Sequence, residues 1–175
     1  LLEKKKIIRK RISILDIGSN DGTFLNLFGR TFKLFGIDPS SEKFKNFYNR
    51  NIFRINKFFS QKNIDNFFKK KRIKQRSFDL ITSFAIFYDI NNPNLFCKEI
   101  HNLLNPKGYW VVEFSYLPLM LKNLTYDQIC HEHVTYYSLT VFNNLIQKHN
   151  LKIVDVSLNE INGGSIEVIC TRKEN

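Results

Sequence analysis

The sequence is poor in the residues and runs that mark several classes of protein. It has three cysteines, Cys97, Cys130 and Cys170, and none belongs to a C-x-x-C pair, so neither a disulfide framework nor a structural zinc site is expected. No apolar run reaches the roughly 18 residues of a membrane span. The basic start of the chain has no apolar stretch behind it that would make a secretory signal. We therefore expect a cytoplasmic protein that does not enter a membrane.

Acidic residues are also scarce, because 16 Asp and Glu stand against 27 Lys and Arg, which gives a formal charge of +11. An AT-rich genome would favour the same excess of Lys, Asn, Ile and Phe, so the charge alone assigns no partner. The densest basic run, Lys69 to Arg76, falls late in an expected helix, where cations suit the carbonyl end. We interpret it as a solvated face. The sequence "NNPN" at Asn91 to Asn94 is not the N-P-P-[YF] run of base-amino methylation, so nucleic acid is not expected as the substrate.

Short apolar segments alternate with segments whose apolar residues have helical spacing. The strands are expected at 11–18, 32–40, 51–59, 77–84, 108–116, 151–158 and 164–171. The helices are expected at 21–30, 41–50, 63–75, 92–108 and 140–150, the second with Tyr48 on its apolar face. Such alternation predicts a parallel sheet that is covered on both faces.

The last two expected strands are joined by the short segment 159–164. A parallel crossover needs about a dozen residues or more, so this pair must be antiparallel. We therefore expect an α/β fold: a Rossmann-like, doubly wound, seven-stranded and mostly parallel sheet with an antiparallel last strand. The length suits a single domain over 1–175 with an insertion at about 117–139.

The first expected strand ends in "LDIGSNDGTFL", which begins with Leu15. Gly18 and Gly22 allow a tight turn that brings the backbone close to a ligand. The following helix offers free N–H groups to an anion. Asp16 is placed to orient this loop or to take a ligand amine. A simple strand-to-helix turn is the alternative interpretation of the two glycines.

The second expected strand ends at Asp38, twenty residues after Gly18. A carboxylate at this position suits the two hydroxyl groups of a ribose. Asn20 stands where a dinucleotide-binding loop would have its second glycine, which argues against a pyrophosphate. The pattern thus predicts a nucleoside cofactor that carries a smaller anion, such as a carboxylate.

With these motifs, "LDIGSNDGTFL" and "GIDPS", the chain resembles class I S-adenosylmethionine-dependent methyltransferases. The resemblance implies S-adenosylmethionine as the cofactor, with its methionine part at Gly18 to Gly22 and its ribose at Asp38. It places Phe58 near the adenine, and Ser83 and Phe84 beside the sulfonium. The residues that it places around the cofactor are Asp16, Gly18, Ser19, Asn20, Gly22, Asp38, Phe58, Ser83 and Phe84.

A second set of motifs is narrower. "YDQICHEHVTYYSL" and "INGGS" resemble C-methyltransferases that act on nucleotide-linked deoxysugars, whose signature is a His-Glu-His run, an aromatic pair and a later Gly-Gly-Ser. Cys130 stands where typical members have Tyr, which puts the role of that hydroxyl in doubt. Typical members also carry a zinc-binding domain in front and another domain behind. We therefore expect this chain to be a piece of a longer protein or a pared-down relative.

Methylation of carbon requires a base, because a C–H next to a ketone must lose its proton to form an enolate. Imidazole suits this task, since its ordinary pKa lies near ambient pH. We assign the base to His133, with Glu132 and His131 orienting it or binding the sugar. Tyr137, or alternatively Tyr136, would donate a hydrogen bond to the enolate oxygen. The implied partner is a small-molecule substrate, a keto-activated nucleotide-linked sugar.

Other interpretations of the same residues remain open. His131, Glu132 and His133 are legitimate metal ligands, although adjacent side chains point apart and further ligands are missing, so no metal is expected. The run could instead be a capping turn before the next helix, and the tyrosine pair could belong to the core. For the whole protein, the alternatives are methylation of oxygen or nitrogen on another small molecule, or a non-catalytic interaction module with this fold.

Overall fold

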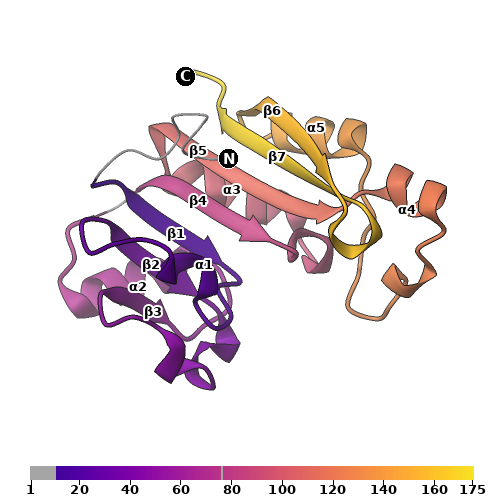
Figure 1. Ribbon diagram of the computed structural model, residues 1–175. Helices are drawn as coiled ribbons and strands as arrows, with labels where there is room; N and C mark the ends of the chain where they lie inside the picture. Colours follow the sequence, from indigo (N-terminus) through magenta and orange to yellow (C-terminus); the bar gives the residue numbers. More distant parts are fainter. Residues whose placement is uncertain (1–10, 76) are drawn as a thin grey trace.

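The computed structural model describes residues 11–75 and 77–175, and a single mixed sheet forms its centre (Figure 1). The sheet has seven strands in the order β3-β2-β1-β4-β5-β7-β6, as expected for a doubly wound fold. In chain order the strands are β1 (Ser13–Ile17), β2 (Lys33–Ile37), β3 (Ile52–Ile55), β4 (Phe78–Phe84), β5 (Leu104–Ser115), β6 (Leu151–Asn159) and β7 (Ser165–Arg172). The start of the chain and Arg76, the end of the basic run, lie outside the described residues.

The first five strands run parallel, and the order of the strands reverses between β1 and β4. All residues of β1 are buried, as expected for a strand that is covered on both faces. Ile17 aligns with Ile37 of β2 and with Ser83 of β4, so these three strands end at nearly the same level. The loops that follow them therefore start at one edge of the sheet, where open α/β sheets bind their ligands.

The expected antiparallel last strand is confirmed. β7 lies between β5 and β6 and is antiparallel to both, with Val112 opposite Val168 in the first pair and Val156 opposite Val168 in the second. Gly163 and Gly164, in the connection between β6 and β7, have φ angles of 75° and 132°. These are values at which a side chain is strained, so the glycines permit the tight reversal that the antiparallel pair needs.

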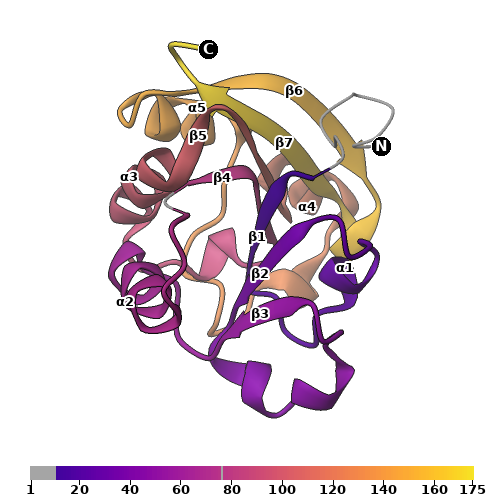
Figure 2. The ribbon, with the colours of Figure 1, turned by 90° about the vertical axis from the view of Figure 1, so that its left-hand side faces the viewer.

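Three helices cover one face of the sheet, and Figure 2 shows them stacked along it. Their aromatic core centres on Phe87, Trp110 and Phe142, which are fully buried. The ring centroid of Phe87 lies 5.8 Å from that of Trp110 and 5.2 Å from that of Phe142. Within the described part of the chain, no helix has the length and apolarity to cross a membrane. The three helices are α2 (Gln61–Lys71), α3 (Pro93–Leu103) and α5 (Leu139–Gln147).

The opposite face departs from expectation, since the helix predicted at 21–30 is much shorter than expected and the α-helix predicted at 41–50 does not form. Only α1 (Thr23–Asn26) forms in the first segment, and two 3₁₀ turns, η1 (Pro39–Glu42) and η2 (Lys45–Phe47), stand near the second. Tyr48 consequently does not lie on the inner side of a helix.

The side chain of Asn26 explains part of this difference. Its Nδ2 donates to the carbonyl of Phe47 (2.7 Å), and its Oδ1 accepts from the N–H of Asn49 (2.9 Å). Amide side chains that satisfy backbone groups in this way compete with helical hydrogen bonds. The two segments are therefore held to each other through side-chain contacts instead of through two packed helices.

Smaller differences concern the ends of elements. The helices expected at 63–75 and 92–108 end earlier, at Lys71 and Leu103, and β5 begins at Leu104. Arg72 ends α2 with a φ of 54°, a left-handed C-terminal residue. The insertion contains a helix that the sequence did not predict, α4 (Leu117–Asn123). Figure 1 shows α4 on the side toward which the arrowheads of β4 and β5 point.

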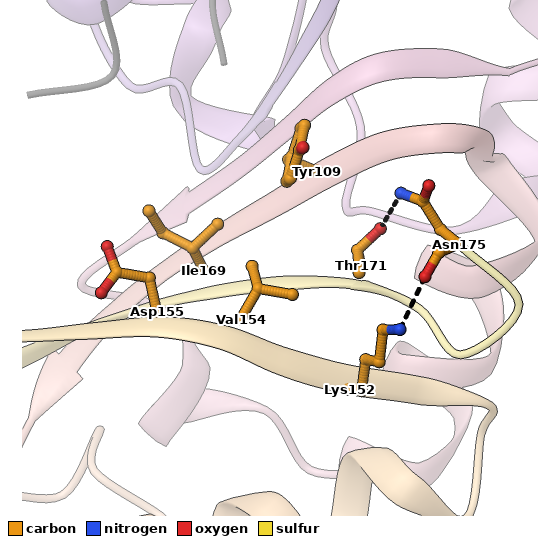
Figure 3. A pocket seen from close by; sticks show the side chains of 7 residues that line it. All are labelled: Tyr109, Lys152, Val154, Asp155, Ile169, Thr171 and Asn175. Carbon is orange, nitrogen blue, oxygen red and sulfur yellow. Dashed lines mark hydrogen bonds between the residues drawn. The ribbon is translucent and has the colours of Figure 1, made fainter. Parts of the chain in front are cut away.

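At the other side of the sheet, Asn175 folds back onto β6 and β7 (Figure 3). Its side-chain Nδ2 donates to Oγ1 of Thr171 (2.7 Å), and Nζ of Lys152 donates to its backbone oxygen (2.6 Å). These residues border an open cavity of about 510 Å³ together with Tyr109 and Ile169. This cavity lies far along β5 and β7 from the ligand-binding edge.

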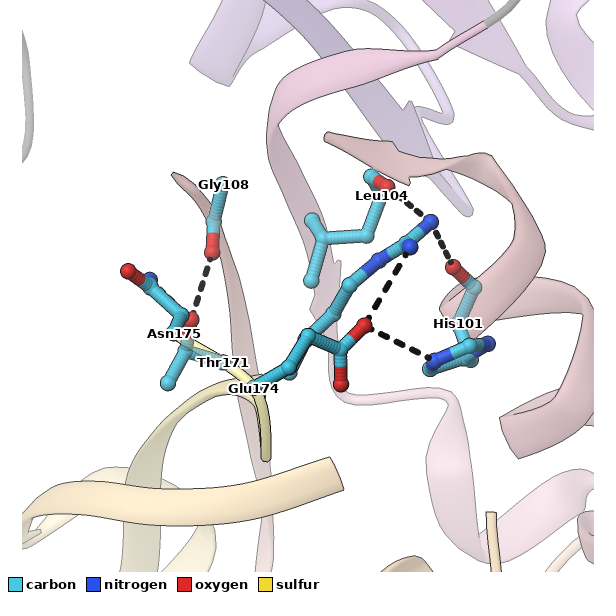
Figure 4. A network of polar contacts seen from close by, with 7 residues as sticks. His101, Leu104, Gly108, Thr171, Glu174 and Asn175 are labelled. Carbon is cyan, nitrogen blue, oxygen red and sulfur yellow. Dashed lines mark hydrogen bonds and ion pairs between the residues drawn. The ribbon is translucent and has the colours of Figure 1, made fainter. Parts of the chain in front are cut away.

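Arg172 joins the end of β7 to the end of α3. Figure 4 shows three residues that it contacts, His101, Leu104 and Glu174, close together. Its Nη2 donates to the carbonyl oxygens of His101 (2.8 Å) and Leu104 (2.6 Å), and its Nη1 lies 3.4 Å from Oε1 of Glu174. Only 18% of the Arg172 side chain is exposed, so solvent cannot replace these bonds freely. The guanidinium thus satisfies carbonyl groups that the helix end leaves without a partner.

We predict that Arg172→Met lowers the free energy of unfolding by about 1.5–3 kcal/mol, because buried carbonyl groups lose charged hydrogen-bond donors. The matched control is Lys173→Met: Nζ of Lys173 donates to the carbonyl of Gln147 (2.8 Å), but the residue is exposed. Its effect should stay within about 0.5 kcal/mol. Urea unfolding of both variants gives the comparison, and equal effects would contradict a structural role for Arg172.

Candidate functional site

The loop after β1 turns sharply against the loop after β4. Gly18 and Gly22 have φ angles of 75° and 80°, which favour glycine. A Cβ atom at Gly18 would lie 2.6 Å from Cγ2 of Ile86, so a larger residue would push the two loops apart. The loops therefore meet where the order of the strands reverses, which is the usual ligand position in such a sheet.

Tyr48 packs against the loop from Gly18 to Gly22, a role that the sequence did not indicate. A Cβ atom at Gly22 would lie 2.8 Å from Cδ1 of Tyr48. The Tyr48 hydroxyl donates to the carbonyl of Asn20 (2.7 Å) and lies 2.9 Å from Oγ of Ser19. Burial raises the pKa of Tyr48 to about 12, so the phenol keeps its proton and remains a donor. The ring and the hydroxyl together hold the glycine loop in its turn.

Asp38 links the ends of β1 and β2. Its Oδ2 accepts from the N–H of Asn20 (3.1 Å), and its Oδ1 accepts from the N–H and the hydroxyl of Ser40 (both 2.6 Å). An ionised carboxylate offers about four acceptor positions. These three bonds leave one position on Oδ2 for a ligand hydroxyl, so the half-buried carboxylate can still bind a ribose.

Asp16 is a buried carboxyl group beneath the same loop and is only 4% exposed. Oγ1 of Thr82 donates to its Oδ1 (2.6 Å). Burial raises the pKa of Asp16 to about 7; the Thr82 bond opposes this shift, and the charge of Asp38 adds to it. A cationic ligand amine would favour the ionised form. Binding of such a ligand would therefore favour ionisation of the Asp16 carboxyl group.

The three other residues predicted near the cofactor lie in different environments. Phe58 follows β3 and is 76% exposed, so its ring is free to cover a ligand. Ser83 is fully buried, and its Oγ accepts from Nε1 of Trp110 (2.9 Å). Phe84 packs edge-on against Phe24, with ring centroids 5.2 Å apart. Ser83 therefore serves the core through its hydroxyl, and the predicted cofactor contacts of all three residues stay predictions.

The insertion docks onto the same edge of the sheet through backbone hydrogen bonds. The N–H groups of Val134 and Thr135 donate to the carbonyl of Tyr88 (2.9 and 3.1 Å), in the short segment after β4. Oγ of Ser115, the last residue of β5, donates to Oε1 of Gln128 (2.9 Å). The His131 to His133 run is therefore carried to the ends of β4 and β5, on the side where the glycine loop lies.

His133 is held in one tautomer. Its Nδ1 lies 2.6 Å from the carbonyl oxygen of Gln128, and a carbonyl can only accept, so this nitrogen carries the proton. The lone pair of the neutral ring is then on Nε2. The imidazole centroid lies 4.1 Å from that of Tyr88. Since Tyr88 and Ile86 belong to one short segment, the imidazole and Gly18 contact the same loop.

The expected orienting role of Glu132 and His131 finds less support in the geometry, because both side chains are exposed. A different carboxylate, Asp89, lies in the segment after β4, and its Oδ1 is buried without a hydrogen-bond partner in the part of the chain that the structure describes. Burial raises the pKa of Asp89, while the charge of His133 opposes this shift and that of Glu132 adds to it. Asp89 is thus a second acid within electrostatic reach of the imidazole.

The two tyrosines after this run have separate positions. Tyr137 is 2% exposed, and its ring centroid lies 5.0 Å from that of Phe87, so the core interpretation applies to it. Tyr136 is half-buried, its hydroxyl donates to the carbonyl of Gln128 (3.3 Å), and its ring centroid lies 6.3 Å from that of His133. Tyr136 is therefore the better placed of the two to reach a ligand.

The alternative interpretations of the run can be compared with the structure. The N-cap of α5 is Ser138, whose Oγ accepts from the N–H of Val141 (3.3 Å), so the His-Glu-His run is not itself the cap. Over 11–75 and 77–175, no group of three or more His, Cys, Asp or Glu side chains could hold a metal ion. The three cysteines are free thiols.

Several residues of the site were not found from the sequence: Tyr48, Thr82, Asp89 and Gln128. Asp89 follows closely after β4, and an acid at the carboxyl end of a strand is a signal that could have identified it. Gln128 acts through its backbone carbonyl, which no pattern of side chains reveals. Tyr48 and Thr82 depend on contacts between segments that are far apart in sequence.

Comparisons with known proteins agree with this geometry. The sequence model of a family described as "Methyltransferase domain" matches residues 1–156. C-methyltransferase NovU of Streptomyces niveus is 30% identical over 156 residues, which are 89% of this chain and 36% of NovU. The chain thus spans little more than a third of the length of this relative.

Solved structures share the fold at low sequence identity. A chain in the complex of a methyltransferase with the Haloferax volcanii Trm112 methyltransferase activator has a TM-score of 0.73 at 13% identity and covers 97% of this chain and 88% of its own. A Bacillus halodurans protein described as a methyltransferase has a TM-score of 0.72 at 10% identity, with coverages of 99% and 97%. Plantazolicin methyltransferase BpumL, in complex with a pentazolic desmethylPZN analog and SAH, has a TM-score of 0.69 at 14% identity, with coverages of 98% and 79%.

We predict that Asp16 makes stability fall as the pH rises from about 4 to about 7. In this range the native state keeps a proton that the unfolded chain releases, so the slope is negative, up to about 1.4 kcal/mol per pH unit. Asp16→Asn should remove this part of the profile in urea unfolding. Asp21→Asn is the control: the bond from Thr23 lowers the pKa of the half-buried Asp21, so its contribution is lost as the pH falls. Parallel profiles for Asp16→Asn and the unmodified protein would contradict the prediction.

Proposed function

The chain belongs to the methyltransferase domain family and its cofactor is S-adenosylmethionine; from this premise we propose that the protein methylates a carbon atom of a keto-activated, nucleotide-linked sugar. The observation that supports this proposal most directly is the tautomer of His133. Its Nδ1 is committed to the carbonyl of Gln128, so the basic Nε2 is available to a substrate at the edge of the sheet where the glycine loop lies.

The residues present fit this cofactor. The loop from Gly18 to Gly22 is held open by two glycines with positive φ and by the hydroxyl of Tyr48, so its backbone can approach a ligand closely. Asp38 retains one acceptor position for a ribose hydroxyl. Asp16, with a pKa of about 7, can ionise opposite the amino group of the methionine part. S-adenosylmethionine supplies an electrophilic methyl group when it is bound.

In this reaction the residues of the chain form and stabilise the carbon nucleophile, an enolate. Nε2 of His133 takes the proton from the carbon next to the ketone, the C–H electron pair moves into the enolate, and the imidazole becomes an imidazolium. Its Nδ1–H stays bonded to Gln128, so the ring keeps its orientation through the step. The hydroxyl of Tyr136 can turn from the Gln128 carbonyl, 3.3 Å away, to the enolate oxygen.

Asp89 would stabilise the imidazolium after the proton has moved. Burial raises the pKa of its carboxyl group and the charge of His133 lowers it, and among the described residues its buried Oδ1 has no hydrogen-bond partner. A negative charge in a partly dry site stabilises a nearby cation more than the same charge in water does. In this scheme Asp89 takes over the part that the sequence suggested for Glu132.

The first prediction of this scheme concerns the cofactor. Asp38→Ala should weaken S-adenosylmethionine binding about 10- to 100-fold in calorimetry, because a charge-assisted hydrogen bond to the ribose is lost. Asp65→Ala removes an exposed carboxylate on α2 and should bind as the unmodified protein does. Unfolding curves recorded on the same samples separate a lost contact from a lost fold. Equal affinity in Asp38→Ala would remove Asp38 from the cofactor site.

The second prediction concerns the base. His133→Gln should lower methyl transfer to a nucleoside-diphosphate-linked keto sugar by about 10²–10⁴-fold and leave S-adenosylmethionine binding unchanged. Exchange of the acceptor's α-hydrogen with D₂O, followed by NMR, should stop in the same variant. His149→Gln, beyond the end of α5, is the control and should retain both activities. Transfer without any exchange in the unmodified protein would favour methylation of oxygen or nitrogen instead.

A further inference from the structure

The Gly-Gly-Ser motif at Gly163 to Ser165 has no part in the reaction proposed above. It lies in the turn between β6 and β7, residues 161–164, where Asn162 and Gly163 have φ angles of 51° and 75°. Asn162 shows that this backbone accepts a residue with a side chain in the left-handed region. The conformation of the turn therefore explains the glycine at position 163 only in part, and its contacts supply a second reason.

The β6–β7 turn packs against the first part of the insertion, and Figure 1 shows it beside α4. Nδ2 of Asn123, the last residue of α4, donates to the carbonyl of Gly163 (2.8 Å). The N–H of Tyr116 donates to the carbonyl of Gly164 (3.0 Å). A Cβ atom at Gly164 would lie 2.7 Å from Cβ of Leu119. The turn and α4 therefore approach each other this closely only because both positions lack a side chain.

At Gly163 the neighbour is Thr125, just beyond the end of α4. A Cβ atom at Gly163 would overlap Cγ2 of Thr125 and would lie 3.0 Å from its Cβ, closer than two carbon atoms pack favourably. The N–H of Thr125 donates to the carbonyl of Met120 (3.1 Å), which ties Thr125 to the helix. A methyl group at position 163 would thus displace Thr125, the turn or both.

Thr125 is connected to His133 through two backbone carbonyl groups. The carbonyl of Thr125 accepts from the N–H of Gln128 (3.2 Å) across the 3₁₀ turn η4 (Tyr126–Gln128). The carbonyl of Gln128 accepts from Nδ1 of His133 (2.6 Å), which is the bond that leaves the lone pair on Nε2. Both bonds join residues only a few positions apart, so a displacement of Thr125 changes the geometry at the imidazole.

We propose that the β6–β7 turn is a positioning element for His133. By lacking side chains at Gly163 and Gly164 it seats α4 and Thr125, and so fixes the carbonyl of Gln128 that selects the tautomer. Gly163 acts through Thr125 and Gln128 and is a positioning residue. The expected effect on turnover rests on the proposed function, whereas the effect on the imidazole does not depend on the acceptor.

A double-mutant cycle separates the contact from the strain of the turn. Gly163→Ala places a methyl group against Thr125 and also strains a backbone of positive φ. Adding Thr125→Ser removes Cγ2, the atom that the new methyl group would overlap, and leaves the strain in place. Thr125→Ser alone completes the cycle. Gly29→Ala is the control, because among the described residues no atom outside its chain neighbours lies within 4 Å of a Cβ atom at that position.

The first measurement is the tautomer of the neutral His133 ring. Long-range ¹H–¹⁵N NMR spectra show which nitrogen carries the proton, and His133→Gln assigns the signals among the four histidines. Gly163→Ala should lose part of the Nδ1–H form, because the tautomer is set by the hydrogen bond that the ring makes. The double variant should recover this form, and Gly29→Ala should keep it. An unchanged tautomer in Gly163→Ala, or a loss that Thr125→Ser does not reverse, would overturn the proposal.

The second measurement is turnover of a nucleoside-diphosphate-linked keto sugar, together with exchange of its α-hydrogen. Gly163→Ala should lower both by about 10- to 100-fold, the effect of displacing a reacting group by about 1 Å, with S-adenosylmethionine binding unchanged. The double variant should regain both activities. Unaltered exchange and transfer in Gly163→Ala would refute the positioning role and leave the proposed function standing. A tautomer that is lost and restored in a protein that methylates no keto sugar would support the positioning role and count against the proposed function.

Discussion

The contact between Gly18 and Ile86 is the constraint on which the site depends. Only a residue without a side chain lets the loop after β1 touch the loop after β4, since a Cβ atom would lie 2.6 Å from the isoleucine. That contact fixes both loops at the reversal of strand order. It also sets the position of Tyr88, which receives the backbone of the insertion at Val134 and Thr135. The cofactor loop and His133 are therefore placed relative to each other through one short segment.

Burial affects the pKa values of the acids in the site more than ion pairing does. Asp16 and Asp89 each have a raised pKa because they are withdrawn from water, and each faces a place where a positive charge is expected to arrive. Asp16 would meet the amine of the cofactor, and Asp89 would meet the imidazolium of His133. For Asp16, whose pKa is about 7, ionisation that accompanies binding of a cation would limit the desolvation penalty of a permanent buried anion. Glu132, which is exposed, could not act in this way.

Much of the fold could be predicted because it follows from local patterns. The alternation of apolar strands and helices gave the parallel sheet, and the short segment 159–164 required the antiparallel last pair. The helices at 21–30 and 41–50 failed in part because Asn26 bonds to the backbone of the other segment, a contact between distant residues that no local period contains. The helix α4 was missed although Leu117, Met120 and Leu124 have helical spacing, because it is only seven residues long and a periodic pattern needs a longer window to be distinguished.

The sequence by itself determined the class of fold and the positions of Gly18 and Asp38 at strand ends, and it supplied the histidine that we propose as the base, because these depend on residue type and spacing. Only the tertiary structure decided which nitrogen of His133 is free, which acid stands near it and which tyrosine is buried. Those properties depend on a backbone carbonyl at Gln128, on the burial of Asp89 and on the packing of Tyr137 against Phe87. Each of these properties depends on contacts between segments that are far apart in the chain. The spacing of residues along a sequence does not reveal such contacts.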